Sequence, residues 1–166
     1  EVDLNQYDNQ LEVFWASGCA FITRKKIFNQ ITFDSTLFAY MEEIDYAWKL
    51  HLLGYKNYVE PKSVIYHDGG EFSSRNFFKS YYNHRNSLIL FLTNHNLMFT
   101  AILLLPKILL ELISLVRYLL LLNFSGIVAQ LSSIMWILSH PHYIIRRIIK
   151  INRFKRKPLY SIIKKM

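Results

Sequence analysis

The sequence predicts an α/β domain followed by apolar and amphipathic helices. Three observations lead to this prediction. Residues 13–23 form a strand-like apolar run, residues 41–53 and 77–94 have helical patterns, and from residue 97 the chain is almost wholly leucine and isoleucine. The chain has 166 residues and 52% of them are hydrophobic, so it is long enough for one ordinary domain and disorder is a poor description of it.

Charge is distributed unevenly along the chain. The formal net charge is +8, yet eleven of the twelve acidic residues lie before Arg75, and the thirteen lysines and arginines after it accompany one acid, Glu111. The two parts are therefore expected in different surroundings. Cys19 is the sole cysteine, which excludes an intrachain disulfide and a metal site built from cysteines. Because the sequence begins at Glu1, we expect it to be a piece of a longer protein.

The first elements are predicted from local patterns. Residues 13–23 are apolar, aromatic and broken by Ser17 and Gly18, which is typical of a buried strand that another backbone approaches closely. Residues 24–29 are expected to form a helical turn, and Asp34 is expected to cap a turn at residues 33–35.

Two longer helices follow. In residues 41–53 apolar side chains recur at helical spacing and Gly54 provides a stop signal. Residues 55–66 alternate well enough for a pair of short strands, broken at Pro61. Residues 77–94 are predicted as a second helix, which carries several tyrosines together with Arg85 and Asn86.

Residues 97–139 are predicted to form apolar, membrane-associated helices. Lys107, Glu111 and Arg117 fall within about a third of the helix circumference and make one polar stripe. Residues 118–139 carry no charge and are long enough to cross a bilayer core of about 30 Å. The sequence leaves open whether this part spans the bilayer or lies along it.

Residues 140–166 are predicted to form a basic amphipathic tail. Its lysines and arginines alternate with isoleucine pairs, a pattern that indicates an anionic lipid surface on the cytoplasmic side of a membrane. The same isoleucine pairs argue against nucleic acid as a partner, because nucleic-acid patches are normally interleaved with polar or stacking residues.

An acidic cluster, Glu42, Glu43 and Asp45, opens the helix predicted at residues 41–53. Acids in a first helical turn complement the helix dipole, which is a purely structural explanation. The aromatic residues around the cluster allow a second one. A carboxylate near apolar rings has its charged form disfavoured, as in a general base.

Four ordered blocks of the sequence resemble one known family. The blocks are SGCAFITRKKIF, FDSTLFAYMEEIDYAWKLHLLGYK, PKSVIYHDGG and YYNHRNSLI, which together span roughly residues 15–96. They resemble the C-terminal half of inverting GT-A glycosyltransferases of the family 2 type, especially rhamnosyltransferase-like members. The resemblance implies that residues 1–96 are the acceptor-side part of a GT-A catalytic domain with a mixed sheet, whose nucleotide-binding half lies elsewhere.

The resemblance also implies a chemistry. Such enzymes take a sugar from a nucleotide-sugar donor, and a carboxylate removes the proton of the attacking hydroxyl on a saccharide or lipid-linked acceptor, with inversion. Glu43 matches the position of that base. The other implied roles are acceptor binding by Glu42, Asp45 and Trp15, and donor binding by Ser17, Gly18 and Arg85. The residues themselves leave structural roles open, such as a packed strand for Ser17 and Gly18 and an ion pair for Arg85.

His67 matches a family position that binds the metal or the diphosphate. The resemblance thus implies a divalent cofactor, Mg or Mn, and hard ions of this kind need further oxygen ligands, which we expect from outside this chain. The isolated chain is therefore expected to be inactive. Two alternatives are a non-catalytic membrane-anchoring protein and a degenerate glycosyltransferase remnant. The expected location is the cytoplasmic face of the cell membrane, peripheral or integral.

Overall fold

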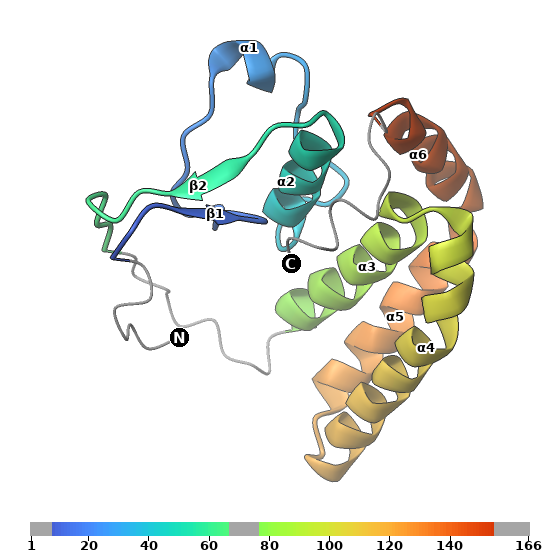
Figure 1. The fold of residues 1–166 in the computed structure, drawn as a ribbon. Helices are drawn as coiled ribbons and strands as arrows, with labels where there is room; N and C mark the ends of the chain where they lie inside the picture. Colours follow the sequence, from blue (N-terminus) through green and yellow to red (C-terminus); the bar gives the residue numbers. More distant parts are fainter. Residues whose placement is uncertain (1–7, 67–76, 155–166) are drawn as a thin grey trace.

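Helices make up most of the structure (Figure 1). The computed structural model describes residues 8–66 and 77–154, of which 64% are helical and 4% lie in strands. These residues form six helices and one two-stranded sheet. The prediction of an α/β domain with the mixed sheet of a GT-A enzyme is therefore wrong for the part of the chain that the structure describes.

The sheet has three residues in each strand. Where β1 would continue, the backbone is bound by side chains instead of by a neighbouring strand. Strand β1 (Leu11–Val13) pairs antiparallel with β2 (Asn57–Val59). Directly after β1, the carbonyl oxygen of Phe14 accepts hydrogen bonds from the side chains of His51 and Asn57, each at 2.8 Å. Residues 14–23 continue as turns and irregular chain. The buried strand predicted at residues 13–23 is therefore wrong, and only one strand forms in residues 55–66.

The predicted helical segments of the N-terminal half are confirmed. Helix α1 (Lys25–Phe28) is a single turn, and α2 (Glu42–Leu52) and α3 (Phe77–Asn94) follow. The backbone N–H of Gly54, which has a φ of 86°, donates to the carbonyl of His51 and ends α2 as predicted. The predicted cap is also present, because Asp34 accepts from the backbone N–H of Thr36 at 3.1 Å.

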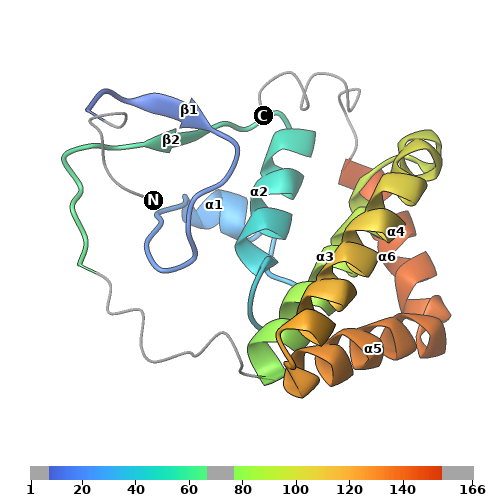
Figure 2. The same ribbon diagram turned by 90° about the horizontal axis from the view of Figure 1, so that it is seen from below.

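Three further helices form the C-terminal part. Helices α4 (Leu97–Leu120) and α5 (Phe124–Ser139) make a hairpin, and α6 (Pro141–Phe154) follows (Figures 1 and 2). The uncharged stretch at residues 118–139 is not continuous, because α4 ends at Leu120 and the side chain of Asn123 caps α5 by accepting from the N–H of Gly126 at 3.0 Å. The helix α5, with 16 residues, is therefore shorter than the uncharged stretch of residues 118–139 in which it lies.

Helix α2 contributes to two of the three buried clusters in the described part of the chain. Its residues Trp48 and Leu52 form one buried cluster with Ile151 of α6, and its residues Tyr46 and Leu50 form another with Ile31. A third cluster joins Leu37 to Ile89 and Leu90 of α3. The C-terminal part is therefore packed on the N-terminal part rather than tethered to it.

The buried face of α6 contains a charged side chain, Arg147. Arg147 is almost fully buried and forms ion pairs with Asp45 of α2 and Asp34 of the preceding loop. Asp45 also pairs with Lys49 at 2.6 Å. A basic tail was predicted at residues 140–166. In its described part, α6, the basic residues do not all lie on the outer surface, because Arg147 is buried and Arg146 is exposed to solvent.

Candidate functional site

The acidic pair Glu42–Glu43 opens α2, and Gly18 lies against it. A methyl group added to Gly18 would stand 3.6 Å from Oε1 of Glu42 and 3.6 Å from Cβ of Glu43. These positions are 24 or more residues apart in the sequence. The structure therefore brings together three of the residues that the sequence analysis assigned to the site.

The loop before the pair has an unusual backbone. Phe38, Tyr40 and Met41 have φ values of 59°, 64° and 67°, in the left-handed region that side chains disfavour. Each such residue costs of order 1–3 kcal/mol, and such residues gather at functional sites. The chain therefore enters α2 through a strained turn that ends directly at Glu42.

Asn86 of α3 holds this turn in place. Its side-chain amide donates to the carbonyl oxygens of Leu37, Ala39 and Tyr40 at 2.8, 2.8 and 2.7 Å. From the sequence, Asn86 together with Arg85 is a candidate for a phosphate or acceptor contact, and that role stays a prediction. No local signal predicts the contacts found here, because the partners of Asn86 lie 46 to 49 positions earlier in the chain.

Arg85 supports the same turn. Its guanidinium donates to the carbonyl oxygens of Thr36 and Leu37 and lies over the rings of Tyr82 and Trp136. The side chain is buried, and each of these contacts is to the protein itself. Its predicted contact with a sugar donor stays a prediction.

The carboxylates of the pair are partly withdrawn from water. Burial raises the pKa of Glu42 above its usual value, and the neighbouring carboxylate of Glu43 raises it further, whereas the backbone N–H of Glu42 acts in the opposite direction. The Oε2 atoms of both residues are buried and find no hydrogen-bond partner in the described part of the chain. Two adjacent acceptors without donors are suited to bind a proton or a hydroxyl group.

Asp45, the third acid of the cluster, points into the core. It is 0% exposed, and it is held by Arg147, Lys49 and the side-chain amide of Asn94. These are the contacts of a structural ion pair. Asp45 has no exposed surface with which to meet an acceptor.

Trp15 and Ser17 lie apart from these contacts. Trp15 is 44% exposed, and the hydroxyl of Ser17 lies 3.1 Å from the sulfur of Cys19. Among the described residues no hydrogen bond joins either side chain to the acidic pair. Their predicted acceptor and donor roles therefore stay predictions.

The predicted metal ligand His67 lies outside the described residues. In residues 8–66 and 77–154 no group of three or more His, Cys, Asp or Glu side chains could hold a metal ion. By themselves, the described residues therefore do not provide the ligand set that Mg or Mn needs.

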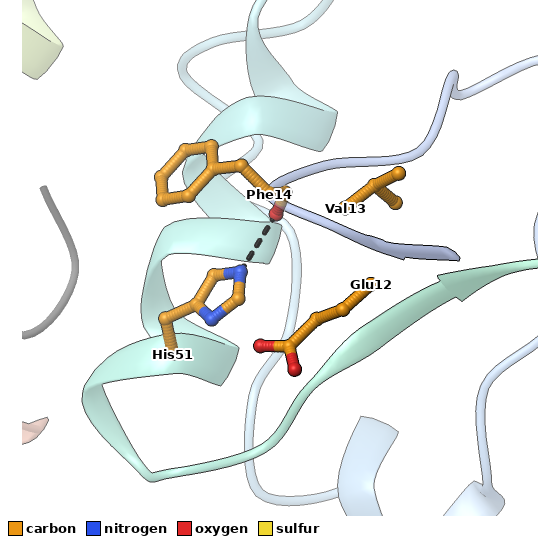
Figure 3. A pocket seen from close by; sticks show the side chains of 4 residues that line it. All are labelled: Glu12, Val13, Phe14 and His51. Carbon is orange, nitrogen blue, oxygen red and sulfur yellow. Dashed lines mark hydrogen bonds between the residues drawn. The ribbon is translucent and has the colours of Figure 1, made fainter. Parts of the chain in front are cut away.

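A separate pocket lies at the end of β1 (Figure 3). It is lined by Glu12, Val13, Phe14 and His51. The ring of His51 stacks on Phe14 with centroids 4.9 Å apart and bonds its carbonyl oxygen, which fixes β1 to α2. This histidine serves the fold, and the pocket contains none of the predicted site residues.

Helix α4 is long and apolar enough to cross a membrane. This property supports membrane association and says nothing about the side of the membrane on which the protein lies. The sequence was compared with models of known protein families, with curated proteins and with solved structures, and none of the three comparisons gave a match.

Proposed function

We propose that this chain supplies the acceptor side of a sugar-transfer site in which Glu43 is the general base. The observation that carries the proposal is the position of Gly18 against Glu42 and Glu43. The four sequence blocks that resemble inverting glycosyltransferases assign these residues to one site, and a methyl group added to Gly18 would be in van der Waals contact with both glutamates. The strained turn held by Asn86 adds support, because it fixes where the pair stands.

The proposed reaction is a single displacement. The carboxylate of Glu43 takes the proton of an acceptor hydroxyl while that oxygen forms a bond to the anomeric carbon of the donor sugar. The bond from this carbon to the nucleoside diphosphate breaks, and the configuration inverts. The buried Oε2 of Glu43 has no hydrogen-bond partner in the described part of the chain, which leaves this oxygen available to accept the proton.

The proposed partners follow from the resemblance and from the apolar helices. They are a nucleotide-sugar donor, a saccharide or lipid-linked acceptor and an anionic membrane, with the protein on the cytoplasmic face. The excess of lysine and arginine in the C-terminal half supports that side of the membrane. A metal and the donor would be bound largely by residues outside those described.

A non-catalytic membrane-anchoring protein, or a glycosyltransferase remnant, is the second candidate. The apolar surface of α4 favours it, because anchoring needs nothing more than that surface. In this case Glu42 and Glu43 would only cap α2.

Glu43→Gln separates the two candidates. Membranes from cells that produce the full protein are incubated with labelled dTDP-rhamnose, UDP-glucose or GDP-mannose, and transfer to lipid or saccharide is measured. Glu43→Gln is expected to lower transfer at least a hundredfold, with membrane binding unchanged. Glu60→Gln, an exposed acid in the same half, is the matched control and should keep full activity. Transfer that is equal in Glu43→Gln and in the unaltered protein would exclude the proposal.

A further inference from the structure

Apart from Arg117 and Ser139, the polar side chains of α4 and α5 are at least partly buried, whereas many of their large apolar side chains are exposed. The exposed face of α5 is Phe124, Val128, Leu131, Met135 and Leu138, whereas Gln130 and Ser133 are buried. A helix at the surface of a water-soluble protein has the opposite arrangement. The outer faces of this hairpin are therefore expected to lie against an apolar partner.

The inward polar groups bind one another. Glu111 of α4 accepts from Lys107 at 2.7 Å and from the amide of Gln130 on α5 at 2.7 Å, and it pairs with His84 of α3 at 2.9 Å. Tyr118 lies 3.2 Å from the other ring nitrogen of His84. Lys107 and Glu111 of the polar stripe of α4 are thus engaged on the protein side, whereas Arg117 at its end is exposed, and the rest of the helix surface that remains for an external partner is apolar.

The charges around the hairpin identify that partner. Glu111 is the sole acid in the described residues 77–154, and it is neutralised in the polar cluster just described. The exposed charges in this part are all positive: Arg117, Arg146, Lys150 and Arg153. An apolar surface next to exposed cations, with no exposed acid, is complementary to a bilayer that contains anionic lipids.

Helix α3 fixes the orientation of α4 relative to that bilayer. At His84 it contacts the middle of α4, and at the next two residues, Arg85 and Asn86, it holds the turn that leads to Glu42. The acidic pair therefore stands level with the middle of α4, on the other side of α3. If α4 crossed the bilayer, Glu42 and Glu43 would lie at the depth of the hydrocarbon centre, where a charged side chain is strongly disfavoured.

We infer that α4 and α5 lie in the plane of an anionic bilayer surface and that neither helix crosses it. In this orientation their apolar faces enter the boundary between headgroups and acyl chains to a depth of about 5–10 Å. Helix α3 then lies above them, and the acidic pair stands about two helix diameters, roughly 20 Å, above the lipid. This last point rests on the proposed function: the pair would act on a part of a lipid-linked saccharide that is held well away from its lipid.

The orientation can be measured with nitroxide labels. In a Cys19→Ser background, single cysteines replace Met98, Leu105, Leu112 and Leu119, which are exposed and share one face because they are seven residues apart. The labelled proteins are bound to vesicles of phosphatidylglycerol and phosphatidylcholine, and the depth of each label is determined from its relative accessibility to oxygen and to a water-soluble nickel complex. We expect four equal, shallow depths. A profile in which Leu105 and Leu112 are deep and the two ends are shallow would overturn the inference.

Two controls keep the result specific. A label at Val64, which is exposed in the N-terminal part, should stay in water. Replacing Arg146, Lys150 and Arg153 together by Gln should lower binding to the anionic vesicles at least tenfold without a change in helix content.

Labels that approach each other in a stable dimer and make no contact with lipid would show that a second copy covers this face, and would also overturn the inference. Because these readouts do not depend on sugar transfer, failure of the proposed reaction leaves them intact.

Discussion

Arg147 of α6 forms a buried ion pair with Asp45 of α2, although 102 positions separate them. The same guanidinium pairs with Asp34, and its Nε donates to the hydroxyl of Thr93 at 3.0 Å. One side chain thus joins α6, α2, α3 and the loop before α2.

Removing this arginine should destabilise the fold strongly. Arg147→Met leaves the carboxylate of Asp45 buried with one cation instead of two, and breaking a buried pair in this way costs about 3–5 kcal/mol. Unfolding by urea in mild detergent, followed by circular dichroism, measures the change. Arg146→Met is the matched control, because Arg146 is exposed on the same helix, and it should change the free energy of unfolding by less than about 0.5 kcal/mol. Equal effects of the two substitutions would contradict the structural role of Arg147.

Acid should weaken the same network. Burial alone would raise the pKa of Asp34, but the charge of Arg147, the N–H of Thr36 and the hydroxyl of Tyr143 outweigh it and hold the pKa below its ordinary value. A carboxyl with a lowered folded-state pKa stabilises the fold above its unfolded value of about 3.9, and this stabilisation is lost as the pH falls through the folded value. The free energy of unfolding should therefore drop below about pH 4, and Asp34→Asn should drop less steeply over that range.

The pKa of Glu42 should depend on the charge of Glu43. The pKa of Glu42 is raised by burial first and by Glu43 second. In carbon-detected NMR of the protein in detergent, the side-chain carboxyl of Glu42 should therefore titrate above the usual value, and Glu43→Gln should bring its pKa part of the way back. A titration of Glu42 that Glu43→Gln leaves unmoved would show that the two carboxyls do not interact.

Backbone strain before the pair can be measured at Phe38. This residue is 74% exposed and has a φ of 59°, so that glycine suits the position better than any residue with a side chain. Phe38→Gly should be more stable than Phe38→Ala by about 1 kcal/mol, because alanine keeps the Cβ that disfavours this conformation. Thermal unfolding of the two variants gives the difference. If the exposed aromatic ring serves the proposed reaction, both variants should also transfer less sugar.

The α4–α5 hairpin should not tolerate a larger residue at Gly126. A methyl group there would stand 2.6 Å from two ring carbons of Tyr118, closer than non-bonded atoms approach. Gly126→Ala should therefore cost about 1–3 kcal/mol and disturb the contact between Tyr118 and His84. Ser125→Ala, at the preceding position, serves as the comparison in the same unfolding experiment and should be nearly neutral.

Local patterns predicted the helices and missed the way in which they pack. The apolar spacing at residues 41–53 and the stop at Gly54 are readable because a helix and its cap depend on neighbours in sequence. The strand expected at residues 13–23 fails because the side chains of His51 and Asn57 bind the carbonyl of Phe14, and nothing in the run itself announces these partners.

In the candidate site, too, the sequence did not reveal which side chains contact residues far away in the chain. The acidic pair and Gly18 were predicted from a resemblance in residue order, and the fold brings them together. Asp45, in contrast, was grouped with the pair because it lies two positions away, but a helix turns successive residues by about 100°, and this rotation carries its side chain into the core. Its partner Arg147 belonged to a tail that was expected to bind lipid.

The buried pair between Asp45 and Arg147 also has a consequence for how the protein is made. At a synthesis rate of about 5–20 residues per second, the 102 positions between them take about 5–20 s to translate. During that interval Asp45 has Lys49 of its own helix as counter-charge but lacks Arg147, and Ile151, which completes the cluster of Trp48 and Leu52, has not been made. The apolar helix α4 leaves the ribosome within the same interval. If α4 binds lipid as inferred above, it can reach the lipid surface before the N-terminal part has closed its core, and the order of synthesis would then favour folding at the membrane.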